Sequence, residues 1–233
     1  MQNQRNEYSI SLRNLSYIIL TISTGIVIHR KFRRIKDIED LSSRFFRGQQ
    51  KSLTKLNSLY GYVTSVGDGD NFRFYHTPGG RLLGWHWLRK VPSNRNALKN
   101  ETLSIRLSGI DAPESGYFGK LGQPFSLEAK QFLARKLEHR SVRVYPLHRD
   151  QYNRAVCGVT YYPIRWLFFK RDIGPQLVSR GLAVVYEGAN SSYYPTEKSV
   201  LMKIQETARK RKLGMHSLGN KLELPKDYKK RNK

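Results

Sequence analysis

The stretch from Glu101 to Glu114, ETLSIRLSGIDAPE, combines the pattern of a β-strand with a cluster of charged side chains. The alternating apolar residues over 101–109 are typical of a half-buried strand. The turn-forming residues that follow place Asp111 and Glu114 close to Arg106 in the chain. A strand that leads into such a cluster predicts a functional site beside it.

Residue patterns on both sides of this stretch predict a small α+β domain. Further strands are expected over 60–66, 71–76, 141–147, 155–162 and, as a short one, 182–186. Helices are expected over 125–138, 172–180 and 196–213. Strands come first and do not alternate regularly with helices, which favours an α+β fold with a small barrel-like sheet and about three helices. Five short strands suit an OB-type barrel, a fold that often binds nucleic acid.

The composition is strongly basic. In 233 residues, 42 Lys and Arg side chains face 18 Asp and Glu side chains, so the formal net charge is +24. This length fits one domain with appendages. So large an excess of positive charge predicts a polyanionic partner, either nucleic acid or an acidic lipid surface. The alternative, a basic protein without such a partner, is disfavoured by the size of the excess.

The cysteine content excludes an intramolecular disulfide, and the histidine spacing gives no sign of a metal site. The single cysteine, Cys157, lies in an apolar, strand-like context and excludes an intramolecular disulfide. This disfavours a secreted, disulfide-stapled protein. We expect Cys157 to be a small core residue and not a nucleophile. The histidines show no spacing typical of metal ligands, and none is assigned a role.

An uncharged run rich in Ile and Leu spans residues 15–28, between Arg13 and the basic segment 30–34. A membrane-spanning helix takes about 20 apolar residues, with about 17 as the lower limit. The run reaches that limit only if its flanking residues are counted. Our first interpretation is a single membrane anchor; a cleaved signal peptide and a buried helix or strand of the domain are the alternatives. The more basic downstream flank would keep the C-terminal bulk on the side from which insertion began.

These patterns divide the chain into five parts. They are a polar N-terminus (1–14), a transmembrane anchor (15–31), a helical linker (32–55), a globular domain (56–217) and a basic tail expected to be disordered (218–233). Within the domain, residues 77–100 are rich in Pro, Gly, Trp and Arg, and predict a long loop or hairpin excursion.

Three carboxylates are candidates for a metal site. Asp70 and Asp111 each follow a strand, at a turn, and would share one cation only if their loops meet in space. Oxygen ligands with no Cys or His cluster nearby favour Ca²⁺ or Mg²⁺ over Zn²⁺. Glu114, at the start of a loop, could deprotonate or orient a water beside the metal. The alternatives are ordinary turn aspartates and a solvated glutamate.

Two arginines and two tyrosines complete the set of candidates. The planar guanidinium groups of Arg106 and Arg154 suit phosphate, because each can bind two oxygens at once. Tyr152 could stack on a base or bind a phosphate, and Tyr186 could support a base, although a packing role fits both equally well. A metal that polarises phosphate, a carboxylate that handles water and arginines that hold developing charge are the parts that phosphodiester hydrolysis requires.

Three motifs in this order resemble the staphylococcal nuclease, or thermonuclease, family. They are Asp68-Gly-Asp70, then Arg106 with Asp111, Pro113 and Glu114, then Asp150 with Tyr152 and Arg154. The resemblance runs from about residue 56 to residue 217, most of the globular part. The N-terminal apolar run and the insertion over 77–100 are similar to a fungal branch of membrane-anchored, mitochondrion-assigned probable endonucleases.

The resemblance implies an OB-fold barrel with three helices and calcium-dependent hydrolysis of DNA or RNA with little sequence specificity. Asp70 and Asp111 would be the side-chain ligands of Ca²⁺, and the backbone carbonyl of Ala112 would be a third ligand. Glu114 would act as the general base or position the water.

The resemblance also implies roles for three residues in substrate binding. Arg106 and Arg154 would bind the phosphoryl group and stabilise its charge, and Tyr152 would contact a substrate phosphate. We therefore expect a monomeric nuclease that is tethered to a membrane by its N-terminal helix, in the mitochondrion on the strength of the resemblance, with nucleic acid as its partner and no protein partner.

Two rival hypotheses remain. The first is a catalytically weak or inactive module that binds nucleic acid and has the same fold, because proteins that share a fold can differ in activity. The second is a membrane-surface or scaffold protein that uses its positive charge on acidic lipid. The second hypothesis explains the basic tail but leaves the acidic motif without a role.

Overall fold

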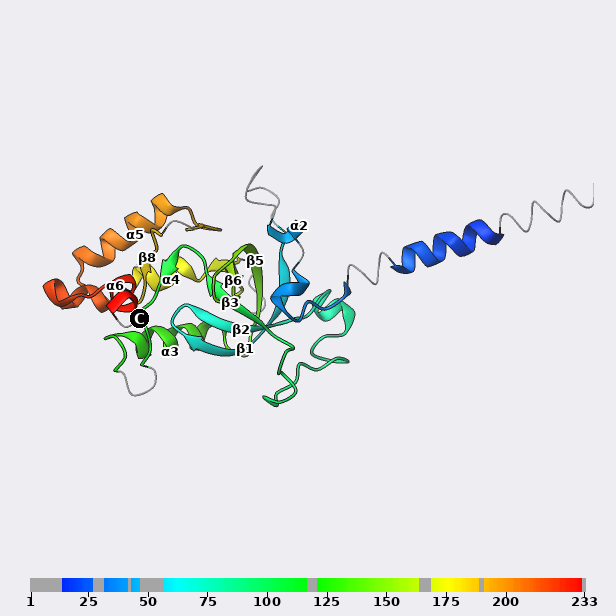
Figure 1. Cartoon of the computed structure of the whole chain (residues 1–233), viewed down its shortest axis with the longest axis horizontal. Helices are drawn as coiled ribbons and strands as arrows, with labels where there is room; N and C mark the ends of the chain where they lie inside the picture. Colours follow the sequence, from blue (N-terminus) through cyan, green and yellow to red (C-terminus); the bar gives the residue numbers. More distant parts are fainter. Residues whose placement is uncertain are drawn as a thin grey trace, which may run out of the picture. The chain divides into compact units, whose positions relative to one another are not determined.

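The computed structural model describes residues 14–26, 32–41, 43–46, 57–116, 121–163, 169–188 and 191–231. Contacts divide the chain into two units, Met1–Arg34 and Ile35–Lys233. In the first unit, residues 14–26 form a helix whose apolar side chains are exposed. The second unit holds the strands and the labelled helices of Figure 1.

The expected single-pass membrane anchor over 15–31 is wrong. In the described part of the chain, no helix is long and apolar enough to cross a membrane. Residues 27–31 of the expected anchor lie outside the described residues.

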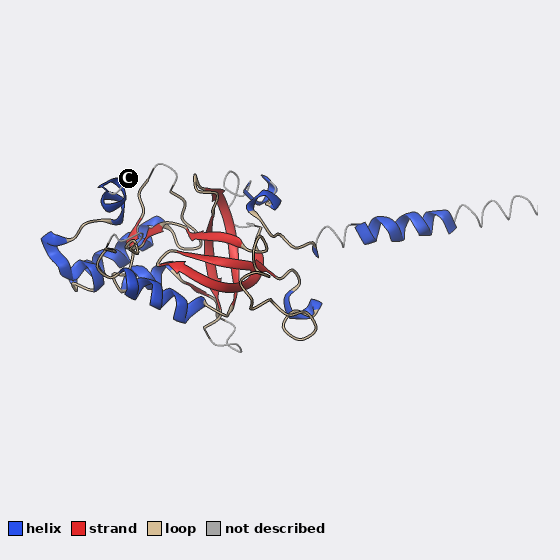
Figure 2. Ribbon diagram, turned by 60° about the horizontal axis from the view of Figure 1, so that its bottom comes forward, coloured by secondary structure: helices blue, strands red, loops and turns tan. Residues whose placement is uncertain are grey.

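The second unit is built on a closed barrel of five strands. They are β1 (Leu59–Asp68), β2 (Asn71–His76), β3 (Leu103–Leu107), β5 (Ser141–Arg149) and β6 (Ala155–Tyr161). Antiparallel pairing gives the order β3-β2-β1-β5-β6, and a parallel pairing of β3 with β6 closes the sheet (Figure 2). The expected α+β barrel is confirmed by this closure.

Three two-residue strands extend this framework. They are β4 (Ile110–Asp111), β7 (Arg171–Asp172) and β8 (Val184–Val185). β7 pairs with the end of β6, and β4 pairs with β8 in a separate ladder. The β4–β8 pair matters for the site, because it fixes the backbone at Asp111 directly after β3.

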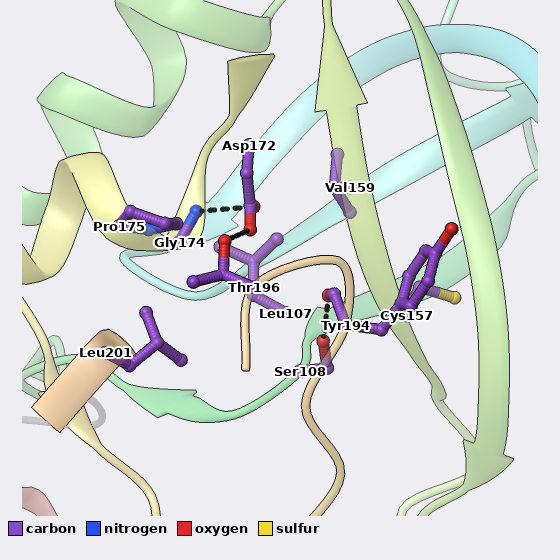
Figure 3. Close-up of a pocket in the computed structure, with 10 residues that line it drawn as sticks. All are labelled: Leu107, Ser108, Cys157, Val159, Asp172, Gly174, Pro175, Tyr194, Thr196 and Leu201. Atoms are coloured by element: carbon purple, nitrogen blue, oxygen red, sulfur yellow. Dashed lines mark hydrogen bonds between the residues drawn. The ribbon is translucent and has the colours of Figure 1, made fainter. Parts of the chain in front are cut away.

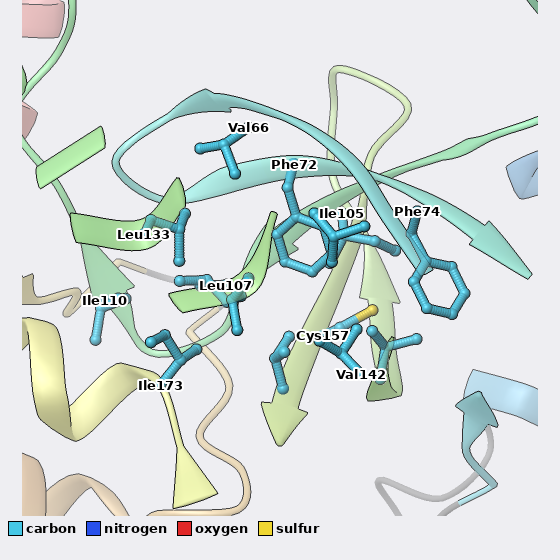
Figure 4. Close-up of a cluster of buried hydrophobic side chains, with 14 of the residues drawn as sticks. Val66, Phe72, Phe74, Ile105, Leu107, Ile110, Leu133, Val142, Cys157 and Ile173 are labelled. Carbon is cyan, nitrogen blue, oxygen red and sulfur yellow. The ribbon is translucent and has the colours of Figure 1, made fainter. Parts of the chain in front are cut away.

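The barrel interior is filled by the alternating apolar residues that predicted the strands. Phe72, Phe74 and Ile105 are almost completely buried, and Figure 4 shows them within one cluster. Cys157 lies in the same cluster, fully buried, and burial raises the pKa of its thiol far above its ordinary value. Its expected role as a core residue is confirmed.

The three expected helices are present as α3 (Ser126–Leu137), α4 (Gly174–Ser179) and α5 (Lys198–Lys210). The apolar stripe of α3 explains its position: Ala129, Leu133 and Leu137 are fully buried in the main core. The stripe of α5 contributes Leu201 to the same core. Amphipathic helices of this kind are stabilised mainly by burial of one face.

The C-terminal segment differs from the disordered tail expected over 218–233. The 3-10 helix η5 (Gly214–Lys221) and the helix α6 (Pro225–Arg231) occupy it, and residues 232–233 lie outside the described part. The Tyr228 hydroxyl donates a hydrogen bond to the carbonyl oxygen of Leu121, at 2.6 Å. A short basic helix has little stability by itself, so tertiary contacts such as this hydrogen bond must stabilise α6.

The compact unit also begins earlier than the expected start at residue 56. Ile35, Ile38 and Leu41 are buried in the main core, and the amide of Ile35 donates to Nδ1 of His76 at 2.9 Å. The 3-10 helix η1 (Ile38–Asp40) and the short helix α2 (Ser43–Phe46) are the helical elements described in the expected linker. Residues 42 and 47–56 lie outside the described residues.

The excursion between β2 and β3 is an irregular loop, as expected, with a 3-10 turn at η4 (Gly80–Leu83). The indole of Trp85 is buried and donates to the carbonyl oxygen of Pro78 at 3.1 Å. The guanidinium of Arg89 lies 4.2 Å from the centre of the Trp85 ring. Trp85 therefore pins this loop, whereas the side chain of Trp87 is 63% exposed.

A glycine in β6 gives a test of this packing. A Cβ atom at Gly158 would collide with the backbone carbonyl of Tyr194, which cannot move as a flexible side chain would. We expect Gly158→Ala to lower the free energy of unfolding by about 1–3 kcal/mol, as overpacking does. Urea unfolding measures this. Gly174→Ala is the control, because its Cβ would meet no atom closer than 3.6 Å, and equal stability of the two variants would contradict the packing described.

Candidate active site

The pairing of β2 with β3 brings the first two motifs together. Asp70 ends the turn between β1 and β2, and its neighbour Asn71 is in register with Arg106 of β3. The amide of Leu107 also donates to the carbonyl oxygen of Asp70, at 2.9 Å. Residues that lie more than thirty positions apart in the sequence thus meet at one end of the β2–β3 pair.

Arg106 contacts both aspartates. Its Nη2 atom lies 2.6 Å from Oδ1 of Asp111, and its Nε atom lies 3.4 Å from Oδ2 of Asp70. Burial alone would lower the pKa of Arg106, but the charges of Asp70 and Asp111 outweigh burial and raise it. The side chain of this mid-strand arginine therefore faces a site and is only 15% exposed.

Both aspartates are almost completely buried. Asp70 is 4% exposed and Asp111 is 2% exposed. Burial raises the pKa of Asp111, the positive charge of Lys229 lowers it, and the result is a pKa above its ordinary value. Buried carboxylates are stable only with partners of opposite charge or with hydrogen bonds. Arg106 provides one such partner for each, so the loops of Asp70 and Asp111 do meet in space, as the metal hypothesis requires.

Glu114 lies on a loop that hydrogen bonds hold in place. Its amide donates to Oε1 of Gln123 at 3.0 Å, and the amide of Gln123 donates back to the Glu114 carbonyl at 2.9 Å. The hydroxyl of Ser115 donates to Oδ1 of Asp68 at 2.7 Å, which ties the same loop to the β1–β2 turn. Burial is the main cause that raises the pKa of Glu114 above its ordinary value.

The third motif forms a turn around Asp150. Oδ1 of Asp150 accepts hydrogen bonds from the amides of Tyr152 and Arg154, both at 2.9 Å. Its Oδ2 atom accepts from Nε of Arg154 at 2.7 Å. These bonds keep the pKa of Asp150 below its ordinary value, against the opposing effect of burial. Arg154 is therefore already paired, and its guanidinium also lies 5.3 Å from the centre of the Tyr152 ring.

The closure of the barrel turns this motif towards Arg106. In the parallel pairing of β3 with β6, Arg106 is in register with Val156. Arg154 comes directly before β6, and the charge of its partner Asp150 is among those that raise the pKa of Arg106. A cavity of about 230 Å³ lies there, lined among others by Arg106, Asp150 and Tyr152.

Tyr186 lines the same cavity. The guanidinium of Arg106 lies 5.4 Å from the centre of the Tyr186 ring. The amide of Tyr186 donates to the carbonyl of Gly109 at 3.0 Å. The hydroxyl of Tyr193 donates to the carbonyl of Tyr186 at 2.6 Å. Tyr186 is thus fixed beside Arg106, where the ring packs against the guanidinium.

A smaller pocket, shown in Figure 3, is a packing feature. Its volume is about 10 Å³, room for one water at most. Asp172, which lines it, accepts hydrogen bonds from the Thr196 hydroxyl at 2.6 Å and from the amide of Gly174 at 3.0 Å. The hydroxyl of Ser108 donates to the carbonyl of Tyr194 at 3.0 Å. These bonds fasten the segment that precedes α5 to the barrel.

Sequence reasoning missed two residues of the site. Nζ of Lys229, on α6, lies 2.7 Å from Oδ1 of Asp111 and 2.8 Å from Oε1 of Glu114. Gln123 holds the amide of Glu114, as described above. In the sequence, Lys229 is one of many cations in a basic tail, so no local signal separates it from its neighbours. The position of Gln123, shortly before the predicted helix, carries no signal either.

Within the described residues, no group of three or more His, Cys, Asp or Glu side chains is arranged to hold a metal ion. A cation at Asp70 and Asp111 would therefore need main-chain carbonyls, waters or substrate oxygens to complete its coordination. Such mixed oxygen ligands are common for Ca²⁺ and Mg²⁺.

Fold and site together define the class of protein. Residues 104–217 match the family described as staphylococcal nuclease homologue. The matched segment includes Arg106, Asp111, Glu114 and Arg154, in the barrel and its flanking helices. This chain belongs to the staphylococcal nuclease family. The resemblance that the three motifs indicated is confirmed.

Fungal proteins are similar to the chain over most of its length. A protein of Schizosaccharomyces pombe named as a probable endonuclease is 54% identical over 212 residues, which cover 91% of this chain and 92% of that protein. Probable endonuclease LCL3 of Clavispora lusitaniae is 46% identical over 200 residues, or 86% of this chain and 82% of that protein. The LCL3 protein of Scheffersomyces stipitis is 40% identical over 233 residues, or 98% and 95% respectively.

Proposed function

We propose that this chain is a calcium-dependent endonuclease that hydrolyses phosphodiester bonds of DNA or RNA with little sequence specificity. Its family and the names of its relatives make it a hydrolytic nuclease, which implies a nucleic-acid substrate. The observation that carries the proposal is the contact of Arg106 with both Asp70 and Asp111. It joins a phosphate-binding group to buried anionic oxygens in one place.

The donor atoms fit a hard cation. The family is typically metal-dependent, and we assign the carboxylates of Asp70 and Asp111 and the carbonyl of Ala112 as ligands. The ammonium of Lys229 already lies on an oxygen of Asp111, so a positive charge is stable at this position. When bound, calcium would polarise the phosphate and stabilise negative charge on it.

The side chains around these ligands suit the remaining roles. Glu114 would accept the proton of the attacking water, and burial supports this because it raises the pKa of its carboxyl towards the range of a general base. Arg106 and Arg154 would bind the phosphoryl oxygens and stabilise the charge that builds on them. Tyr152, exposed at the rim of the cavity, would contact a substrate phosphate.

A module that only binds nucleic acid is the less favoured alternative. Such a module would need positive charge but no buried carboxylates, because carboxylates repel the phosphate backbone. Here Asp70 and Asp111 lie directly beside the arginine that would bind phosphate. An arrangement of that kind supports binding of phosphate through a metal.

Removal of calcium is expected to abolish cleavage. With the full chain, plasmid DNA, single-stranded DNA and RNA, we expect EGTA to reduce the cleavage rate at least about 100-fold, because a metal of this kind contributes several kcal/mol to the transition state. Binding measured in parallel by fluorescence anisotropy separates the two hypotheses. Cleavage that EGTA leaves unchanged would exclude calcium dependence, and binding without cleavage in calcium would favour the binding module.

A further inference from the structure

The C-terminal helix α6 places one ammonium group among the carboxylates of the site. Nζ of Lys229 lies within 2.8 Å of oxygens from both Asp111 and Glu114. The side chain therefore bridges the residues proposed as metal ligand and general base.

The contact is specific to one lysine of the helix. Lys226 and Lys230 also lie on α6 and are exposed. In the part of the chain that the structure describes, neither of them forms an ion pair, whereas the side chain of Lys229 is only 34% exposed and forms two. General attraction between a basic helix and an acidic site would act on all three lysines alike. The position of α6 instead brings Lys229 alone of these three into contact with the carboxylates.

Two hydrogen bonds fix α6 in this position. The hydroxyl of Tyr228 donates to the carbonyl of Leu121 at 2.6 Å, and Nε2 of Gln123 donates to the carbonyl of Glu223 at 3.1 Å. The same Gln123 side chain accepts the hydrogen bond from the amide of Glu114. One glutamine thus connects the C-terminal segment, which Figure 1 shows at the end of the chain, with the loop that carries the candidate base.

An ammonium and a divalent cation compete for these oxygens. Both are attracted by the same carboxylates, and two cations on one oxygen repel each other strongly in a partly buried place. Without any cation, Asp111 and Glu114 would lie near Asp70 with Arg106 as the principal counter-charge. Uncompensated buried charges are costly, so a lysine that neutralises them stabilises the metal-free protein.

We infer that Lys229 is an internal counter-cation that occupies the carboxylate site in the metal-free protein, and that α6 must withdraw it before a divalent cation binds. The C-terminal helix then acts as an autoinhibitory element of the nuclease, released by calcium. The inference rests on the proposed calcium site, and it adds a residue and a helix that would control access to that site.

The test is the affinity of the full chain for calcium, measured by isothermal titration calorimetry without nucleic acid. We expect Lys229→Met, which keeps most of the aliphatic stem, to bind Ca²⁺ about tenfold more tightly than the unmodified chain, a change of about 1.4 kcal/mol. Lys230→Met is the matched control, because it removes the same charge from an exposed position of the same helix. Its calcium affinity should stay within about twofold, since an exposed charge is screened by solvent.

A second variant tests the role of α6 without a change of charge. Tyr228→Phe removes the hydrogen bond to Leu121 and retains Lys229, so calcium affinity should rise in the same direction but by less. In the unmodified chain, calcium should also increase amide hydrogen exchange in α6. Thermal unfolding establishes that each variant is folded.

The outcomes separate this inference from the proposed function. Equal calcium affinities for the unmodified chain and Lys229→Met, or weaker binding by the variant, would leave the calcium site standing and overturn the role of Lys229. No calcium binding by either protein would overturn the calcium site and the inference together. Calcium binding that leaves hydrogen exchange in α6 unchanged would contradict the withdrawal of the helix.

Discussion

Glu114→Gln is expected to slow phosphodiester cleavage by about 10²–10⁴-fold, the usual contribution of a general base. The amide keeps the size of the side chain but cannot accept a proton from water. The loop should keep its position, because the two hydrogen bonds between the backbone of Glu114 and Gln123 do not involve the carboxylate, whose ion pair is with Lys229. Single-turnover cleavage at saturating calcium measures the effect, because substrate binding and product release then do not limit the rate.

The control for this variant is Glu128→Gln, which removes the same charge from an exposed position of α3. It should cleave at the rate of the unmodified chain. The calcium affinity of Glu114→Gln is measured as a second control, because the substitution also removes one of the two carboxylates that pair with Lys229. If Glu114→Gln cleaves at a rate within threefold of that of the unmodified chain, Glu114 is excluded as the base.

Arg106→Ala is expected to reduce both stability and activity. Removal of one partner from a buried ion pair costs about 3–5 kcal/mol, and we expect about 3 kcal/mol here, because Lys229 still compensates Asp111. Cleavage should fall by about 10²–10³-fold, the usual effect of removing one donor that stabilises transition-state charge. Urea unfolding and single-turnover cleavage measure the two effects separately.

Two further arginine variants separate stability from catalysis. Arg106→Lys keeps the positive charge but loses the planar fork, so it should recover stability more than cleavage. Arg154→Ala removes a more exposed arginine, paired with Asp150, and should lower cleavage with a smaller loss of stability. An Arg106→Ala variant that unfolds at the same urea concentration as the unmodified chain would contradict the role of Arg106 as counter-charge for the two aspartates.

Much of the fold followed from local patterns. The alternation of apolar residues in β3 and the apolar stripe of α3 predicted the elements that the structure contains, because burial of one face is what makes each element stable. The barrel itself followed from the number and order of the strands. The parallel pairing of β3 with β6 could not be predicted in the same way, because pairing depends on side-chain packing across the whole barrel.

The candidate site divides in a similar way. Arg106 and Asp111 are close in sequence, so their contact could be anticipated, and the family resemblance indicated Asp70 as well. The roles assigned to these residues remain predictions. The expected membrane anchor was wrong, because the part of the chain that the structure describes contains no helix long and apolar enough to span a bilayer.

The sequence by itself determined the strands, the main helices, the family and the charged motifs, because these depend on side chains that are neighbours in the chain or repeat at a regular spacing. Only the tertiary structure decided that Ile35 joins the core and that Lys229 reaches Asp111 and Glu114. Lys229 and Asp111 are separated by 118 positions, and α6 is stable only through its contacts with the domain. A single lysine in a basic tail gains its partners from the packing of that helix.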